Sequence, residues 1–168
     1  MRKTLIAFME DRPGVLNRVA SMIRRRNFNV VSLAVAPTET PAISRMTTVL
    51  ECDESQEEQV GKQLRKLINV TRVVTDLKPE NAIFRELALI KVNATPSSRS
   101  EIIHLAEVFR SQVVDVSPAT LTIEITGTED KIDSFIELLR PFGLRELART
   151  GPVAMLRGPL NSHGAAQE

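Results

Sequence analysis

Apolar and polar residues alternate along the first 77 positions with two different periods. Runs at 5–9, 31–35, 46–50 and 70–75 have the length and the composition or two-residue period of β-strands. Between these runs, apolar residues recur every three or four positions, which is the period of a helix that buries one face. The two helical stripes comprise Val15, Leu16, Val19, Ala20 and Ile23, and then Val60, Leu64, Leu67 and Ile68. The predicted order is strand, helix, strand, strand, helix, strand.

The same order of elements is predicted again after a short polar segment. Residues 78–83 include Pro79 and are predicted to form a linker. Beyond the linker, strands are predicted at 87–92, 113–116, 121–125 and 144–148, and helices at 102–109 and 132–139. The sequence therefore predicts domains at 1–77 and 84–157. Residues 158–168 contain few apolar side chains and are predicted to form a loose tail.

This pattern predicts an α+β fold class, with two ferredoxin-like βαββαβ domains in tandem. Each domain would be a four-stranded antiparallel sheet with both helices on one face. The other face of each sheet would be bare, so we expect the chain to self-associate as a homodimer. The fold does not decide function, because the same arrangement serves RNA readers, small enzymes and ligand sensors.

Charge and cysteine content exclude several classes of protein. The chain has 22 Lys and Arg against 21 Asp and Glu, so its net charge of +1 attracts neither nucleic acid nor an anionic membrane. Its single cysteine, Cys52, rules out an internal disulfide framework, and no apolar run is long enough for a signal segment or a membrane span. We therefore expect a cytoplasmic protein with no nucleic-acid or membrane partner.

The sequence lacks the residue patterns that RNA binding or catalysis would require. An RNA reader of this topology stacks bases on exposed aromatic side chains, yet the chain has no Trp, no Tyr and only six Phe. An enzyme would need a nucleophile with a base, or a cluster of metal ligands. His104, His163 and Cys52 belong to no shared motif. We predict no catalytic and no metal-binding residues in this chain.

The stretch from Glu10 to Leu16, EDRPGVL, predicts a helix start that could bind an anion. Asp11 is predicted to cap the helix and Pro13 to occupy its first turn, neither of which requires Gly14. A bare glycine would let a carboxylate approach the free N–H groups at the helix start, as the acid end of an amino acid would. Asn29, at the start of the next strand, could add a polar contact from a neighbouring strand or subunit. The same residues also fit a plain strand-to-helix turn, so the two readings stay open at this point.

The first unit resembles the ACT domain, a regulatory module that binds amino acids at domain interfaces. The resemblance rests on its strand, its Pro-Gly-Val-Leu helix entry and its return strand. A wider resemblance, from Arg2 to about Gly158, is to the small regulatory subunit of acetolactate synthase. It is carried by the segments SLAVAPTETPAISRMTTVL, KQLRKLINVTRVV, RELALIKV, VFRSQVVDVSP and ELARTG.

The resemblance implies a non-catalytic partner of a large enzyme subunit that condenses pyruvate with pyruvate or 2-oxobutanoate. That large subunit would carry thiamine diphosphate, Mg²⁺ and FAD, none of them bound by this chain. The small subunit would raise its activity and confer feedback inhibition by valine in branched-chain amino acid synthesis. The alternative is a free-standing ACT-type amino-acid sensor that regulates another enzyme or transcription; the family-like second domain argues against it.

The resemblance also implies an effector site shared between two subunits. Its residues in this sequence would be Asp11, Arg12, Pro13, Gly14, Val15 and Leu16 at the helix entry, with Asn29 and Val30 on the second strand. Asp11 stands where the family commonly has Asn, and Asn27 where it commonly has Gly. Near the C-terminus, Pro152, Ala154, Met155 and Leu156 replace a segment richer in Gly and Ser.

Overall fold

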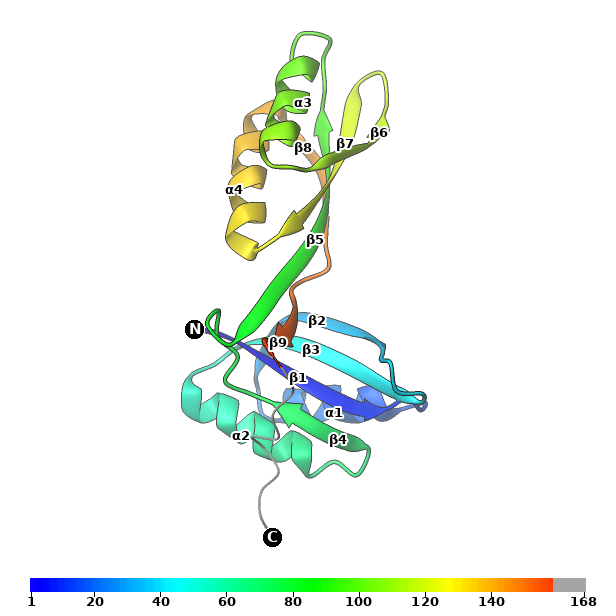
Figure 1. Cartoon of the computed structure of the whole chain (residues 1–168), viewed down its shortest axis with the longest axis vertical. Coiled ribbons are helices and arrows are strands. Elements are labelled where there is room, and N and C mark those ends of the chain that lie inside the picture. Colours follow the sequence, from blue (N-terminus) through cyan, green and yellow to red (C-terminus); the bar gives the residue numbers. More distant parts are fainter. Residues whose placement is uncertain (159–168) are drawn as a thin grey trace. The chain divides into compact units, whose positions relative to one another are not determined.

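The computed structural model describes residues 1–158, and within them the chain forms two compact units (Figure 1). The first unit comprises Met1–Ile83 and the segment that starts at Val153; the second comprises Phe84–Pro152. The tail predicted at 158–168 lies, beyond residue 158, outside the described residues. Within residues 1–158, every helix is too short or too polar to cross a bilayer.

The first unit has the predicted βαββαβ order. Its sheet is antiparallel with the strand order β2-β3-β1-β4, so β2 and β4 are the outer strands. Both helices lie on one face of this sheet (Figure 1). The elements are β1 (Arg2–Glu10), α1 (Val15–Arg25), β2 (Asn29–Pro37), β3 (Ile43–Glu51), α2 (Glu54–Arg65) and β4 (Val70–Val74).

The core of the first unit lies between the sheet and its two helices. Alternate residues of β1 face the helices because successive strand side chains point to opposite faces. Leu5, Ala7 and Met9 on β1 pack in one cluster with Val15, Val19 and Ile23, the apolar stripe of α1, and with Val60 and Leu64 of α2. The helical periods found in the sequence are therefore the buried faces of α1 and α2.

The opposite face of the first sheet is partly covered, contrary to the prediction of a bare face. Ile6 and Thr47, which are paired in the register on this face, are only 1% and 3% exposed. A short strand that the sequence did not predict, β9 (Val153–Leu156), belongs to the same compact unit and pairs with β5 (Ala82–Asn93). The guanidinium of Arg45 donates a hydrogen bond to the Ala154 carbonyl. The sequence had assigned β9 to the second domain.

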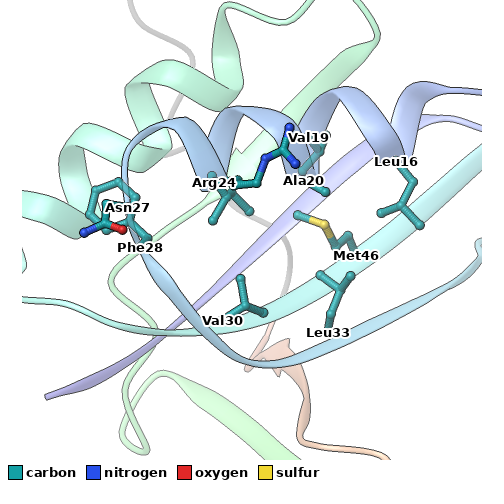
Figure 2. Close-up of a pocket in the computed structure, with 10 residues that line it drawn as sticks. Leu16, Val19, Ala20, Arg24, Asn27, Phe28, Val30, Leu33 and Met46 are labelled. Atoms are coloured by element: carbon teal, nitrogen blue, oxygen red, sulfur yellow. The ribbon is translucent and has the colours of Figure 1, made fainter.

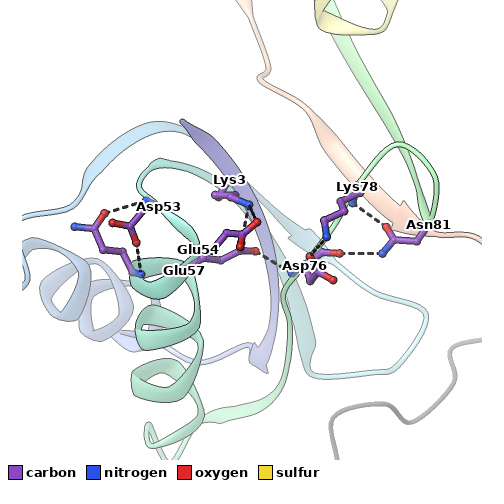
Figure 3. A network of polar contacts seen from close by, with 8 residues as sticks. Lys3, Asp53, Glu54, Glu57, Asp76, Lys78 and Asn81 are labelled. Atoms are coloured by element: carbon purple, nitrogen blue, oxygen red, sulfur yellow. Dashed lines mark hydrogen bonds and ion pairs between the residues drawn. The ribbon is translucent and has the colours of Figure 1, made fainter.

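A polar network attaches the turn after β4 to helix α2 (Figure 3). Glu57 is 4% exposed, and its Oε1 accepts a 2.8 Å hydrogen bond from the Asp76 backbone N–H. Its other carboxylate oxygen lies 3.6 Å from the Lys3 ammonium, so the buried charge is both paired and hydrogen-bonded. At the start of α2, Asp53 and Gln56 form a reciprocal capping box.

The second unit repeats the βαββαβ order, as predicted. Its antiparallel strands are ordered β6-β7-β5-β8, and a separate core lies between them and two helices. Ala82 and Ile83, from the predicted linker 78–83, already belong to β5. Besides β5, the elements are α3 (Arg99–Val108), β6 (Gln112–Val116), β7 (Thr120–Gly127), α4 (Glu129–Leu139), the 3-10 turn η1 (Arg140–Phe142) and β8 (Leu144–Arg149).

An ion pair closes the end of this second core. The Glu86 side chain is 3% exposed and accepts two hydrogen bonds, of 2.7 and 2.8 Å, from the Arg149 guanidinium. Arg149 also bonds to Asp133 of α4 at 2.6 Å, so one cation holds β5, β8 and α4 together. These carboxylate partners raise the pKa of Arg149 above its usual range.

Candidate functional site

Helix α1 begins after a glycine in a conformation that other residues adopt with strain. Gly14 is the N-cap, and its φ of 85° lies in the left-handed region, where a side chain costs about 1–2 kcal/mol. The prediction that Asp11 caps this helix is wrong, because no side chain among residues 1–158 caps the helix start. Pro13 also lies ahead of the first turn, which begins at Val15. Gly14 is thus required by the turn itself, which agrees with the plain strand-to-helix turn that the sequence left open as an alternative.

The start of α1 is open to an incoming acceptor. Apart from Val15, whose N–H bonds weakly to the Arg12 carbonyl at 3.3 Å, the first-turn N–H groups are not capped by any described side chain. A side chain built at Gly14 would meet no heavy atom within 4 Å, so the approach is unobstructed. By contrast, α2 is closed by its capping box. The free N–H groups and the helix dipole give α1 a partial positive charge at this point.

Around the helix start, the two charged residues predicted for the site are both exposed. The Arg12 guanidinium lies 3.3 Å from the Glu10 carboxylate, and its side chain is 71% exposed. The Asp11 backbone N–H bonds to the Ala42 carbonyl, while its carboxylate has no partner among the described residues. Asp11 is therefore a free negative charge close to the open helix start.

Asn29, the polar residue predicted on the second strand, lies at the other end of α1. Its Nδ2 donates a 2.6 Å hydrogen bond to the Glu51 carboxylate on β3. Helix α1 has 11 residues and is therefore about 16 Å long, which separates Asn29 from Gly14 in one chain. The structure does not bring the two halves of the predicted site together within a single subunit.

An apolar groove of about 190 Å³ runs between α1 and the outer strand β2 (Figure 2). Leu16 and Val30, two of the predicted site residues, line it. Figure 2 shows Leu33 beneath the Leu16 end of the helix and Val30 nearer the Arg24 end. The remaining lining residues are Val19, Ala20, Ile23, Asn27, Phe28 and Met46.

Beside this groove, apolar side chains of β2 remain exposed. Val30, Leu33 and Val35 pair in register with Leu50, Thr48 and Met46, whose side chains face the helical layer. Each of the three β2 side chains is nevertheless about 40% exposed, as is Leu16 of α1. We call Leu16, Val30, Leu33 and Val35 the seam. Leu33 and Val35 were missed as candidates, although their alternation beside a proline-rich turn is visible in the sequence.

The residues considered for chemistry in the sequence do not assemble. His104 is exposed on α3, and its Nδ1 lies 3.9 Å from a Glu107 carboxylate oxygen. Cys52 is buried, and this burial raises the pKa of its thiol. Among residues 1–158, no three His, Cys, Asp or Glu side chains are grouped as a metal ion would require. His163 lies outside the described residues.

Comparison with known proteins decides the family. Residues 5–72 match the profile of the AHAS small subunit-like ACT domain, and residues 85–158 match the profile of the small subunit of acetolactate synthase. The chain belongs to the acetolactate synthase small-subunit family. The ACT domain predicted from the helix entry is thereby confirmed, and the second unit is the family's C-terminal domain.

Relatives in this family extend over nearly the whole chain. A probable acetolactate synthase small subunit of Methanothermobacter thermautotrophicus is 52% identical over 153 residues, which is 90% of each chain. The acetolactate synthase small subunit of Mycolicibacterium smegmatis is 49% identical over 156 residues, covering 93% of this chain and 91% of its own. The crystal structure of the Thermotoga maritima small subunit superposes with a TM-score of 0.88 at 40% identity, covering 95% of this chain and 99% of its own.

Proposed function

We propose that this chain is a regulatory subunit that binds the large catalytic subunit of acetolactate synthase, raises its activity and makes it sensitive to feedback inhibition by valine. Membership of the small-subunit family supports the choice of partner. The observation that carries the effector part is the uncapped start of α1, which lies beside an apolar groove at an unpaired sheet edge. An amino acid has a matching carboxylate and, in valine, a matching branched apolar side chain.

The effector site is completed by a second copy of the chain. In one subunit, β2 runs from Asn29, near the end of α1, back towards the helix start. Antiparallel pairing of β2 with its copy about a two-fold axis reverses that direction. The partner copy's strand start then lies beside the open start of α1. The two halves that one subunit holds about 16 Å apart, Gly14 and Asn29, meet across the seam.

In this arrangement each group of the effector has a counterpart of suitable chemistry. The carboxylate accepts hydrogen bonds from the first N–H groups of α1, where the helix dipole favours an anion. The side chain packs beside Leu16 and Val30 of the seam. Asn29 retains its amide oxygen as an acceptor for the effector's ammonium group, since the structure uses its Nδ2 for Glu51. Arg12, Pro13 and Val15 shape the turn that presents these N–H groups.

Regulation then works by linkage between the effector and the catalytic subunit. An effector that bridges two copies binds one arrangement of the dimer better than another, and it shifts the complex only by that difference in affinity. The chemistry stays on the catalytic subunit, to which we assign thiamine diphosphate, Mg²⁺ and FAD. This chain contributes no reacting group; it contributes the dimer and the effector site.

The proposal is tested by rebuilding the holoenzyme. The purified chain alone should produce no acetolactate, should co-purify with its cognate large subunit, and should raise that subunit's turnover in a titration that saturates. Valine should then inhibit the rebuilt complex but not the large subunit alone. Failure to bind the large subunit would favour the free-standing sensor, and binding without inhibition would remove the effector part of the proposal.

Asp11 is expected to weaken valine binding. Its exposed carboxylate neither caps α1 nor pairs with another described residue, so it repels the effector's carboxylate at the helix start. Asp11→Asn removes this repulsion, which is worth about 1 kcal/mol when well screened. We expect the valine concentration that gives half inhibition to fall roughly fivefold. Valine titrations of holoenzyme rebuilt with each variant measure it, and weaker inhibition by the Asn variant would mean that Asp11 holds the ammonium group.

A further inference from the structure

The corner between α1 and β2 has a counterpart in the second unit, between α3 and β6, with the same left-handed backbone conformation at one residue. Asn27 follows α1 with φ of 58°, and Arg110 follows α3 with φ of 52°, a shift of 83 positions. The Asn27 N–H bonds to the Arg24 carbonyl and the Arg110 N–H bonds to the Glu107 carbonyl, both at 3.0 Å and with the same shift. Left-handed residues other than glycine are uncommon, so this agreement marks an equivalent corner.

The two outer strands that leave these corners share a second irregularity. In β2 the register with β3 shifts between Val30 and Ser32, which leaves Val31 as the extra residue of a bulge. In β6 the register with β7 shifts between Val113 and Asp115, which leaves Val114 extra. The same shift of 83 positions relates the two bulges. Strand β6 is therefore the counterpart of β2, the strand whose edge we propose as the dimer seam.

The counterpart strand also has an exposed apolar edge. Val116 occupies the position equivalent to Leu33 of the seam and is 62% exposed, and Val114 is 51% exposed. On α3, Ile103 is equivalent to Ala20 and is 37% exposed. The opposite outer strand of this sheet, β8, instead carries Arg145, Glu146 and Arg149, charges of the kind that protect an edge from pairing.

Ahead of α3, two hydroxyl side chains bond within a turn that replaces the Pro-Gly entry of α1. Thr95 N–H bonds to Ser98 Oγ at 3.0 Å, and Ser98 N–H bonds to Thr95 Oγ1 at 3.2 Å. Ser98, the N-cap of α3, makes no side-chain cap bond to the helix start, and it stands in place of the left-handed Gly14 of the first unit. The second unit thus keeps an unpaired edge without the glycine entry that the first unit offers to the proposed effector.

We propose that the β6 edge pairs with the β6 edge of a second copy of this chain, as a contact that needs no effector. This inference rests on the proposed use of β2 as a seam, because the two strands are equivalent. Charge supports a copy of the same chain as the occupant. Arg110 precedes β6 and has no side-chain partner among the described residues, while Asp115 lies near the strand's other end. Antiparallel two-fold pairing centred on Val113 and Val114 brings each Arg110 within diagonal reach of the other copy's Asp115.

The contact is expected to be weak by itself. Strand β6 has only five residues, which bury far less than the roughly 800 Å² per partner of a stable interface. It would add to the N-terminal seam by raising the effective concentration of chains already held together. We therefore test for proximity of the two edges rather than for dimerisation alone.

Cysteine cross-linking of the full chain tests the pairing. Val114→Cys places a thiol at the centre of the proposed contact, and the matched control Leu147→Cys places one on β8, where Leu147 is 43% exposed. The native Cys52 is 4% exposed and does not compete. Under mild oxidation, V114C should form covalent dimers about tenfold faster than L147C, since paired edges raise the effective thiol concentration. Equal rates would overturn the proposal.

Charge reversal identifies the partner of the edge. In the V114C protein, Arg110→Glu or Asp115→Arg alone should slow cross-linking, and the two together should restore it. If these charge reversals abolished activation of the catalytic subunit and left cross-linking unchanged, the β6 edge would be assigned to that subunit and the proposal would be overturned. Leu33→Lys is tested in a separate protein without the added cysteine, so that each proposal is judged by its own variant. If the Leu33→Lys protein still dimerises through β2 or still responds to valine, the proposed seam is wrong. The proposed β6 contact is tested only by the cross-linking rate of V114C.

Discussion

Replacement of Leu33 by lysine is expected to break the N-terminal dimer and abolish inhibition by valine. Leu33 lies in the middle of the seam, 40% exposed on the outer strand, and two-fold pairing brings the same position of both chains close together. The change would place two ammonium groups near one another and remove apolar area from the contact. Loss of one central anchor typically weakens an interface by about 2 kcal/mol or more, or roughly thirtyfold in the dissociation constant. Light scattering and sedimentation of the full chain measure this loss.

The control for this variant lies on the same unit but outside the seam. Val153→Lys also places a charge on a half-exposed valine, 51% exposed in β9, and should leave the dimer intact. In rebuilt holoenzyme, Leu33→Lys should lose valine inhibition because the effector site needs both copies. Normal inhibition by a monomeric Leu33→Lys protein would show that one subunit holds the whole site.

Gly14→Asp is expected to abolish the valine response and leave the dimer in place. The aspartate would put a carboxylate at the open start of α1, where it can itself accept the free N–H groups and take the position of the effector's carboxylate. Its charge would also repel the effector's carboxylate by about 1 kcal/mol when well screened. Together these effects should raise the half-inhibitory valine concentration by more than about tenfold.

Gly14→Asn separates charge from backbone strain. Both substitutions must adopt the φ of 85°, which Asn and Asp tolerate better than most residues. No atom lies within 4 Å of the new Cβ, so neither variant is expected to clash. The Asn variant should therefore lose less of the valine response than the Asp variant, at equal dimer content. Equal losses would assign the effect to the backbone, and an intact response in both would move the effector site away from Gly14.

Local signals explain which parts of the fold could be predicted. The stripe of Val15, Val19 and Ile23 is set by the helical repeat and appears in the core as predicted. The prediction for α2 extended too far: the helix ends at Arg65, and Ile68 is 88% exposed. Apolar spacing alone cannot distinguish a residue inside the last turn from one just beyond it.

At the start of α1, the sequence predicted the strand-to-helix turn but not the residue that caps the helix. Asp11 and Pro13 have good propensities for a cap and a first turn, yet the chain uses Gly14 as the N-cap and begins the helix at Val15. The turn geometry depends on the backbone path from β1 into α1, including the bond of the Asp11 N–H to the Ala42 carbonyl. Residue propensities contain no term for that long-range contact.

The sequence by itself determined the two βαββαβ repeats, their buried faces and the position of the Pro-Gly helix entry, because these follow from periods and turn residues within a few positions of one another. Only the tertiary structure decided that β9 belongs with the first unit, that β2 and β6 are outer strands, and that Asn29 lies a helix length away from Gly14. Each of these depends on pairing between segments far apart in the chain. Such pairing is selected by the packing of the whole domain, and no local pattern encodes it.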